Sequence, residues 1–211
     1  MIKAVIFDLD GVIVSTDDCH YEAWKKMANE EGIYFDKTIN NRLRGVSRME
    51  SLEIVLEKAE KEYSYEEKLQ LAERKNGYYK EFITKLTSND ILPGVMKTLD
   101  GLKRKGIKVA IGSSSKNTPT ILKQIGLDNY FNAVSDGNNI SNSKPDPEVF
   151  LKAADMMGIP YEECMIVEDA DAGIEAGKRA GMKTISVQGA KGADVEIAGL
   201  SEILILEINP K

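Results

Sequence analysis

The chain has 211 residues, 42% of them hydrophobic, which is enough for one large domain or for a domain with a smaller insert. Its 34 acidic residues outnumber its 28 basic ones, and the formal net charge of −6 argues against a nucleic-acid-binding protein. No apolar run approaches the roughly 18 residues that a membrane span needs, so we also expect no membrane partner.

The cysteines and the N-terminus predict the cellular compartment. Cys19 and Cys164 are far apart and form no CxxC motif, which is typical of a reduced protein. The N-terminal residues lack the long apolar region and the cleavage site of a signal peptide. We therefore expect a cytoplasmic protein, and we expect it to be a monomer.

A short apolar strand near the N-terminus ends in acidic residues. The run 5–7 predicts a buried strand, and Asp8-Leu9-Asp10-Gly11 follows it. Because side chains alternate along a strand, Asp8 and Asp10 would point the same way and Leu9 the opposite way. Two carboxylates this close repel each other unless a shared proton or a cation relieves them. A solvated turn after the strand would explain the same residues.

Only helices are predicted between about residues 15 and 88. The apolar spacing and the N-cap residues predict helices over residues 18–31, 37–43, 47–62 and 64–86. Ser47 and Glu50 match a capping box at the start of the third helix.

From residue 89 onward, helices alternate with strands. We predict strands over 107–112, 131–135, 164–167, 183–187 and 203–206, and helices over 93–105, 117–125, 147–157 and 172–180. This alternation implies right-handed crossovers and a parallel sheet with helices on both faces.

The predicted fold class is α/β, with a doubly wound, Rossmann-like parallel-sheet core and an inserted all-helical domain. The core would comprise residues 1–14 and 89–211, and the insert residues 15–88. An insert of this length is too long for a loop, and it leaves the core close to Asp8 and Asp10, where it could cover them. Its polar first crossing, at Ser15 and Thr16, suits a hinge.

Three later strands also end in polar residues. The segment 113–117, rich in serine, precedes a helix and could bind an anion, although an ordinary N-capped loop is the favoured interpretation of this segment alone. Lys144 precedes a proline-rich turn, where a solvated lysine is the default interpretation. Glu168 and Asp169 end an apolar strand; they suit a hard cation such as Mg²⁺, or a helix cap.

Taken in order, these segments resemble the four motifs of the haloacid dehalogenase superfamily. They are Asp8-Leu9-Asp10-Gly11, a serine at a strand end, Lys144-Pro145 and Glu168-Asp169, and the helical insert lies where that family has its cap domain. The segments 44–48, 74–76 and 113–117 narrow the resemblance to the phosphoglucomutase branch of the superfamily.

The resemblance implies phosphoryl transfer through an aspartyl phosphate on Asp8, with Asp10 as general acid and base. It implies Mg²⁺ as the cofactor, held by Asp8, the backbone carbonyl of Asp10 and Asp169, with Glu168 close by. The core residues that it assigns to phosphate binding are Ser113, Ser114, Ser115, Lys116, Asn117 and Lys144.

In the insert, the resemblance assigns Arg48 to the phosphate that is not being transferred, because a guanidinium can bind phosphate through two hydrogen bonds. Arg44 stands where relatives often have lysine, which keeps the charge and changes the geometry. Ser15 stands where an aspartate is common, which leaves the hydrogen bonding of the hinge open. The other insert residues assigned to the substrate are His20, Trp24, Gly45 and Ser51.

The implied reaction converts β-D-glucose 1-phosphate into glucose 6-phosphate through the 1,6-bisphosphate, so the expected partner is a small sugar phosphate. One alternative is a Mg²⁺-dependent sugar-phosphate phosphatase of the same fold, in which water takes the phosphoryl group from Asp8. Another is a catalytically silent protein that binds sugar phosphates. Arg48 and the segment 115–117 favour the mutase, and the intact set of acidic residues and Lys144 argues against a silent protein.

Overall fold

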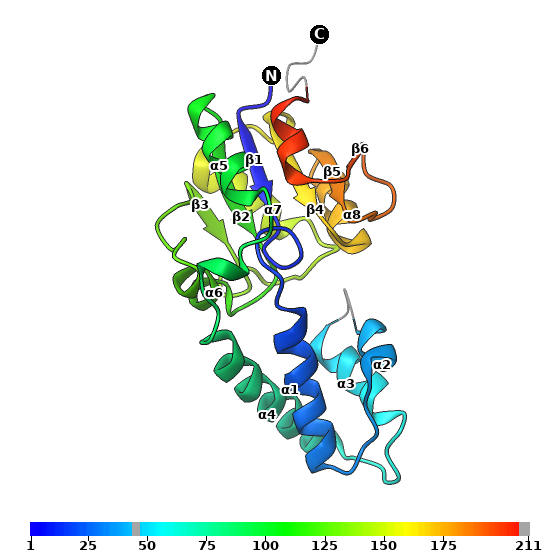
Figure 1. Cartoon of the computed structure of the whole chain (residues 1–211). Helices are drawn as coiled ribbons and strands as arrows, with labels where there is room; N and C mark the ends of the chain where they lie inside the picture. The colour runs from blue at the N-terminus through cyan, green and yellow to red at the C-terminus, as the bar shows by residue number, and fades with distance from the viewer. Residues whose placement is uncertain (44–46, 207–211) are drawn as a thin grey trace. The chain divides into compact units, whose positions relative to one another are not determined.

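The structure is a computed structural model that describes residues 1–43 and 47–206 (Figure 1). The chain divides into two compact units. We call them the sheet unit, Met1–Ser15 with Thr87–Lys211, and the helical unit, Thr16–Leu86.

The sheet unit is built on six parallel strands in the order β3-β2-β1-β4-β5-β6. This order reverses between β1 and β4, and in open α/β sheets the crevice for a ligand forms at the carboxyl ends of the strands at such a reversal. The predicted doubly wound parallel sheet is therefore confirmed. The strands are β1 (Ala4–Phe7), β2 (Lys108–Gly112), β3 (Ala133–Ser135), β4 (Cys164–Glu168), β5 (Lys183–Val187) and β6 (Val195–Ile197).

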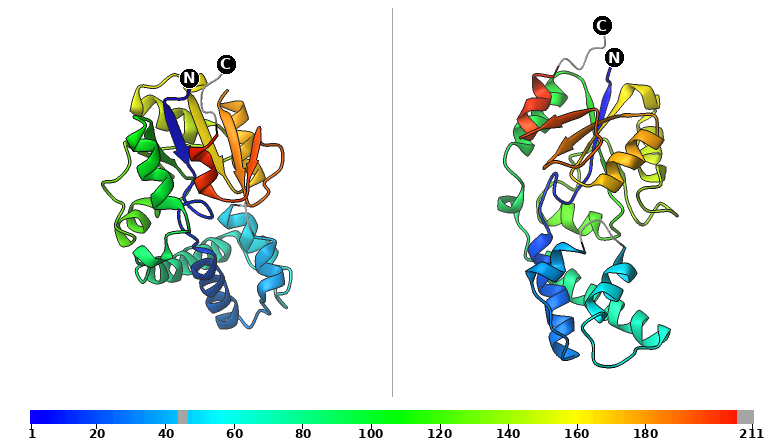
Figure 2. Two further views of the ribbon diagram at one scale, coloured as in Figure 1. Left: turned by 45° about the horizontal axis from the view of Figure 1, so that its top comes forward. Right: turned by 90° about the vertical axis from the view of Figure 1, so that its right-hand side faces the viewer.

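Helices cover both faces of this sheet, so its central strands are apolar on both sides. Helices α7 (Glu148–Met157) and α8 (Asp171–Arg179) pack on the face that presents Ile6 and Ile166. Helix α5 (Val95–Arg104) and the 3₁₀ helix η3 (Leu200–Leu204) lie on the other side of the sheet (Figure 2). The remaining short helices are η1 (Ser88–Asp90), α6 (Thr118–Gln124) and η2 (Tyr161–Glu163).

The predicted strand over residues 203–206 is wrong. Leu200 and Ile203 are buried and lie three residues apart, which places them on one side of the 3₁₀ helix η3. Leu204 packs against Gly101 of α5, where a Cβ would lie 2.5 Å from a Leu204 methyl group. The last strand is instead β6, a three-residue edge strand that is too short to produce a strong apolar pattern.

The helical unit contains four α-helices and, within its described residues, no strand, as predicted. They are α1 (Asp17–Glu30), α2 (Lys37–Asn41), α3 (Arg48–Leu56) and α4 (Tyr65–Ile83). The unit has a core of its own, to which α1 contributes Trp24 and Met27, α3 contributes Leu52 and Val55, and α4 contributes Leu71. No helix in the described part of the chain is long and apolar enough to cross a membrane.

Two capping boxes start the later helices of this unit. Ser47 accepts the Glu50 N–H, and Glu50 in turn accepts the Ser47 N–H at 2.9 Å, which confirms the predicted box. Ser64 and Glu67 make the same pair at the start of α4. The third helix nevertheless ends at Leu56, before the predicted end at residue 62.

Candidate active site

Asp8 lies at the carboxyl end of β1, beside the point where the strand order reverses. It is 8% exposed, and its N–H donates to the Val167 carbonyl of the neighbouring β4 at 2.9 Å. β1 ends at Phe7, so Asp8 and Asp10 lie beyond the strand and its alternation does not orient them. Asp8 is buried and Asp10 half-buried.

Lys144 forms ion pairs with two of the acidic residues at the ends of β1 and β4. Its Nζ lies 2.5 Å from Oδ1 of Asp8 and 2.5 Å from Oε1 of Glu168. Burial alone would lower the pKa of Lys144, but the charges of Asp8 and Glu168 outweigh it and raise the pKa above its usual range. The lysine is therefore a permanent positive charge at the end of β1.

Asp169 completes a group of three carboxylates with Asp8 and Glu168. One oxygen of each lies within 4.8 Å of the others. Burial raises the pKa of Asp8 by more than Lys144 lowers it. Burial also raises the pKa of Asp169, and the neighbouring charges of Asp8 and Glu168 add to the effect. Three carboxylates this close together repel one another unless protons or a bound cation reduce their negative charge.

The donor set fits a hard divalent cation. Carboxylate oxygens are the ligands that Mg²⁺ prefers, and Asp8 and Asp169 offer them at the required spacing. Glu168 is oriented by the backbone, since its Oε2 accepts the N–H groups of Asp169 and Ala170 at 2.9 and 3.0 Å. The carboxylate of Asp10 is not part of this group, so its assignment as a ligand, through its backbone carbonyl, stays a prediction.

A glycine makes room for this cluster. Gly11 has a φ of +83°, and a Cβ at this position would lie 2.1 Å from Oδ2 of Asp169. Only a residue without a side chain allows the backbone to approach the carboxylate this closely.

The serine-rich loop after β2 reaches the same place. Ser113 is 4% exposed, and its Oγ accepts the Ser115 N–H at 3.2 Å. Oγ of Ser115 accepts the Asn117 N–H at 3.2 Å, so the loop is held by its own hydroxyls. Oγ of Ser114 accepts the Lys144 N–H at 3.3 Å, which ties this loop to the lysine. The structure thus brings the predicted residues 113–117 to Lys144, with Lys116 exposed.

In the helical unit, His20 and Trp24 surround a buried lysine. Lys75 is 3% exposed, and its Nζ lies 2.9 Å from Nδ1 of His20 and 4.8 Å from the centroid of the Trp24 ring. The His20 ring stacks on Tyr79 at a centroid distance of 4.1 Å. Burial, together with the charges of Lys75 and Arg48, holds the pKa of His20 well below its usual value. A neutral His20 can accept a hydrogen bond from Lys75.

The other predicted residues of the helical unit are placed in part. Ser51 is buried in α3 at 4% exposure. Arg48 begins the same helix with its side chain 40% exposed, and it lies 3.6 Å from Glu73. Arg44 and Gly45, also predicted to contact the substrate, lie outside the described residues.

The predicted hinge coincides with the boundary between the units. Ser15 is exposed and is the last residue of the first segment of the sheet unit. Thr16 is fully buried, and its Oγ1 accepts a hydrogen bond from the Tyr79 hydroxyl at 3.1 Å. A hinge function for these residues stays a prediction.

Sequence reasoning missed two residues near the charge cluster and one in the helical unit. Gln188 follows β5, and its Nε2 donates to the Gly11 carbonyl at 2.7 Å from a backbone with a φ of +63°. Glu148 holds the loop that carries Lys144. Lys75 was noted only as a member of the segment 74–76. Of these three residues, only Lys75 has a signal in the sequence, because it stands between an arginine and an asparagine.

Comparison with known proteins shows which family this chain matches. The family model of haloacid dehalogenase-like hydrolases matches residues 2–181. A β-phosphoglucomutase of Bacillus subtilis is 44% identical over 97% of this chain and 92% of its own length. A phosphorylated carbohydrates phosphatase of Thermotoga maritima is 33% identical, over 87% of this chain and 84% of its own.

A solved structure agrees with the sequence matches. The crystal structure of β-phosphoglucomutase from Clostridium difficile superposes with a TM-score of 0.85 at 41% identity, and the match covers 96% of this chain and 93% of that one. The family match includes Asp8, Lys144, Glu168 and Asp169. This chain therefore belongs to the haloacid dehalogenase-like hydrolases, the superfamily that its motifs resemble.

Proposed function

We propose that this protein is a β-phosphoglucomutase that converts β-D-glucose 1-phosphate into glucose 6-phosphate through an aspartyl phosphate and the 1,6-bisphosphate. The observation that carries the proposal is the cluster of Asp8, Lys144, Glu168 and Asp169, in a chain that resembles β-phosphoglucomutases over nearly its whole length. We further propose that the protein is a monomer and that it is located in the cytoplasm.

Asp8 is the nucleophile in this proposal. One of its oxygens attacks a phosphorus of the 1,6-bisphosphate, and the bond from that phosphorus to the sugar oxygen breaks, which leaves a glucose monophosphate. Lys144 stays protonated and favours the ionised, nucleophilic form of the Asp8 carboxylate. In the second half of the reaction, a hydroxyl of the sugar attacks the phosphoryl group on Asp8 and restores the carboxylate.

Asp10 moves the proton that each half-reaction requires. It donates a proton to the sugar oxygen that leaves, and it takes one from the sugar hydroxyl that attacks. Asp10 lies two residues after the proposed nucleophile and is half-buried, so it is more accessible to solvent than Asp8.

Residues that follow β2 and β3 would stabilise the charge of the transferring phosphoryl group, together with an ion held by residues that follow β1 and β4. Lys144 and Ser113 would bind its equatorial oxygens, where negative charge is spread in the transition state. A Mg²⁺ ion held by Asp8 and Asp169, with Glu168 alongside and the Asp10 carbonyl as a further ligand, would neutralise the charge of the carboxylates and of the phosphoryl group.

The helical unit supplies the residues for the remainder of the substrate. We assign Arg48 to the phosphate that is not being transferred, and His20, Trp24 and Ser51 to the sugar. The domain boundaries that we propose are residues 15–88 for a cap domain and residues 1–14 with 89–211 for the core.

A single assay tests the proposal. Purified protein is incubated with β-D-glucose 1-phosphate and Mg²⁺, with and without the 1,6-bisphosphate, and both glucose 6-phosphate and inorganic phosphate are measured. We expect glucose 6-phosphate to form, with stimulation by the bisphosphate. Release of inorganic phosphate in place of glucose 6-phosphate would instead identify a sugar-phosphate phosphatase.

A further inference from the structure

The loop that carries Lys144 is held by a carboxylate that the proposed chemistry does not use. The loop connects β3 to α7. A lysine side chain has a flexible stem of four carbons, so its ammonium stays in one place only if the backbone beneath it is fixed.

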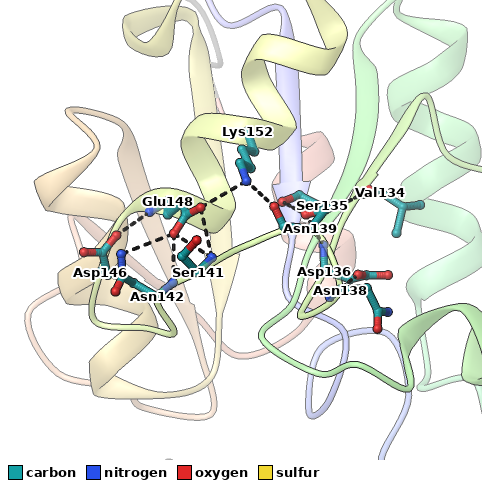
Figure 3. A network of polar contacts seen from close by, with 10 residues as sticks. All are labelled: Val134, Ser135, Asp136, Asn138, Asn139, Ser141, Asn142, Asp146, Glu148 and Lys152. Carbon is teal, nitrogen blue, oxygen red and sulfur yellow. Dashed lines mark hydrogen bonds and ion pairs between the residues drawn. The ribbon is translucent and has the colours of Figure 1, made fainter.

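Glu148, the first residue of α7, binds the first arm of the loop (Figure 3). Its two carboxylate oxygens accept the Ser141 N–H at 3.0 and 2.9 Å, and Oε2 accepts the Asn142 N–H at 2.8 Å. Ser141 and Asn142 are both exposed, so apolar packing does not hold them. The hydrogen bond from Asn142, together with nearby Lys152, lowers the pKa of Glu148 and keeps it charged.

The second arm of the loop is tied to the same residue. Oδ1 of Asp146 accepts the Glu148 N–H at 3.0 Å, and the Asp146 N–H donates to the Ser143 carbonyl at 3.0 Å. Lys144 lies between these two arms, and its own N–H donates to Oγ of Ser114. Glu148 thus closes a ring of hydrogen bonds around the backbone of Lys144.

An ordinary helical ion pair is the competing explanation for Glu148. Nζ of Lys152 lies 3.0 Å from Oε1 of Glu148, one turn further along α7, and it also donates to the Asn139 carbonyl. Pairs of this spacing contribute little when exposed, and the Lys152 side chain is 43% exposed. The ion pair also does not explain why the carboxylate takes two N–H groups of the loop.

We propose that Glu148 is a positioning residue for Lys144: by binding the N–H groups of Ser141 and Asn142, it keeps the Lys144 ammonium on Asp8 and Glu168. The kinetic consequence rests on the proposed function, whereas the placement of Lys144 does not. This difference allows the two to be tested separately.

The experiment compares Glu148→Ala, Glu148→Gln and Lys152→Ala. Lys144 is labelled by reductive methylation and its labelling rate is followed by mass spectrometry, while kcat and KM are measured for sugar phosphate and for an aryl phosphate. We expect Glu148→Ala to speed labelling of Lys144 and to lower kcat for both substrates by about tenfold or more, since small misplacements of catalytic groups are costly. Glu148→Gln keeps an acceptor oxygen and should recover most of kcat, and Lys152→Ala should behave as the wild type.

The outcomes separate the two proposals. Unchanged labelling of Lys144 in a folded Glu148→Ala protein overturns the positioning role, whether or not kcat falls. Faster labelling in a protein whose wild type makes no glucose 6-phosphate supports the positioning role and overturns the proposed function. If Glu148→Ala does not fold, Glu148→Asp, which is one methylene shorter, takes its place with the same expectations.

Discussion

At the scale of single residues, the proposed reaction depends on one oxygen of Asp8. Asp8→Asn replaces it with an amide nitrogen, which cannot form an acyl phosphate, so we expect turnover to fall below about a thousandth of that of the wild type. The amide is similar in size, so the far-UV circular dichroism spectrum should be unchanged. Mass spectrometry after incubation with the 1,6-bisphosphate provides the decisive measurement. A phosphorylated Asp8→Asn protein would place the nucleophile elsewhere.

Gly11 allows a second residue-scale prediction. Gly11→Ala adds a Cβ where Oδ2 of Asp169 lies 2.1 Å away, so the carboxylate must move. Its φ of +83° adds a strain of about 1–2 kcal/mol. We therefore expect lower stability together with Mg²⁺ binding weakened by about tenfold or more, measured by calorimetric titration.

Gly106→Ala is the matched control for this prediction. Gly106 also has a positive φ, +74°, but a Cβ there meets nothing within 4 Å. This variant should lose stability only through the strain of its positive φ and keep its affinity for Mg²⁺. Equal metal affinity in the two variants would show that Asp169 does not depend on the space beside Gly11.

At the scale of elements, the ends of β1 and β4 make the metal-free protein sensitive to pH. The pKa values of Asp8 and Asp169 are raised in the folded state, mainly by burial. The folded protein thus holds protons that the unfolded chain releases above about pH 4. The stability that these two groups contribute is present at low pH and is lost as the pH rises through their raised values.

Urea unfolding at pH 5 and pH 8 measures this effect. We expect the stability advantage of Asp169→Asn over the metal-free wild type to grow from pH 5 to pH 8. The comparison cancels His20, whose lowered pKa acts in the opposite sense below about pH 6.5 and is common to both proteins. Mg²⁺ at a hundred times its Kd should stabilise the wild type by about 2.7 kcal/mol and the variant by much less. A difference that does not change with pH would contradict the prediction.

Elements also show what the sequence can predict. Long periodic segments such as α4, and apolar runs such as β1 and β4, were predicted because burial on both faces or along one stripe leaves a pattern in the sequence. The strand prediction for residues 203–206 was wrong because a run of apolar residues alone does not distinguish a strand from one 3₁₀ turn.

The site shows the same limit. Asp8, Glu168 and Asp169 could be predicted because parallel strands bring their carboxyl ends together. Lys144 lies in the long loop after β3 and was predicted only from its lysine–proline motif. Glu148 and Gln188 bind backbone N–H and C=O groups of other segments. Almost every residue has these groups, so the sequence alone does not predict such contacts. The hollow of about 350 Å³ on the helical unit, lined by Glu31, Tyr63 and Arg74, was likewise not predicted.

At the scale of the whole molecule, Arg48 separates a mutase from a phosphatase. In the proposed function the core would bind one phosphate, whereas a mutase must also hold a second. Arg48→Ala should lower mutase turnover by roughly a hundredfold, because a charge-assisted hydrogen bond to a phosphate is lost. Hydrolysis of an aryl phosphate, which carries no second phosphate, should be nearly unchanged. A parallel fall in both activities would instead assign Arg48 to the transferring group or to the fold.

Arg42→Ala is the matched control for Arg48. Arg42 is another half-exposed arginine of the helical unit, with both of its terminal nitrogens on Glu57 at 2.7 Å. Exposed ion pairs of this kind, and the 3.6 Å pair of Arg48 with Glu73, contribute at most about 1 kcal/mol. Both variants should therefore stay folded, and Arg42→Ala should keep both activities.

The central place of β1 has a consequence for how the chain is made. On the ribosome, β1 emerges before either of its neighbours: its first partner, β2, begins at Lys108, after the entire helical unit. At 5–20 residues per second, the nascent strand waits roughly 5 to 20 seconds for that partner. The helical unit has its own core and can fold during this delay. Asp8, the proposed nucleophile, is therefore translated before either of the strands that lie beside β1.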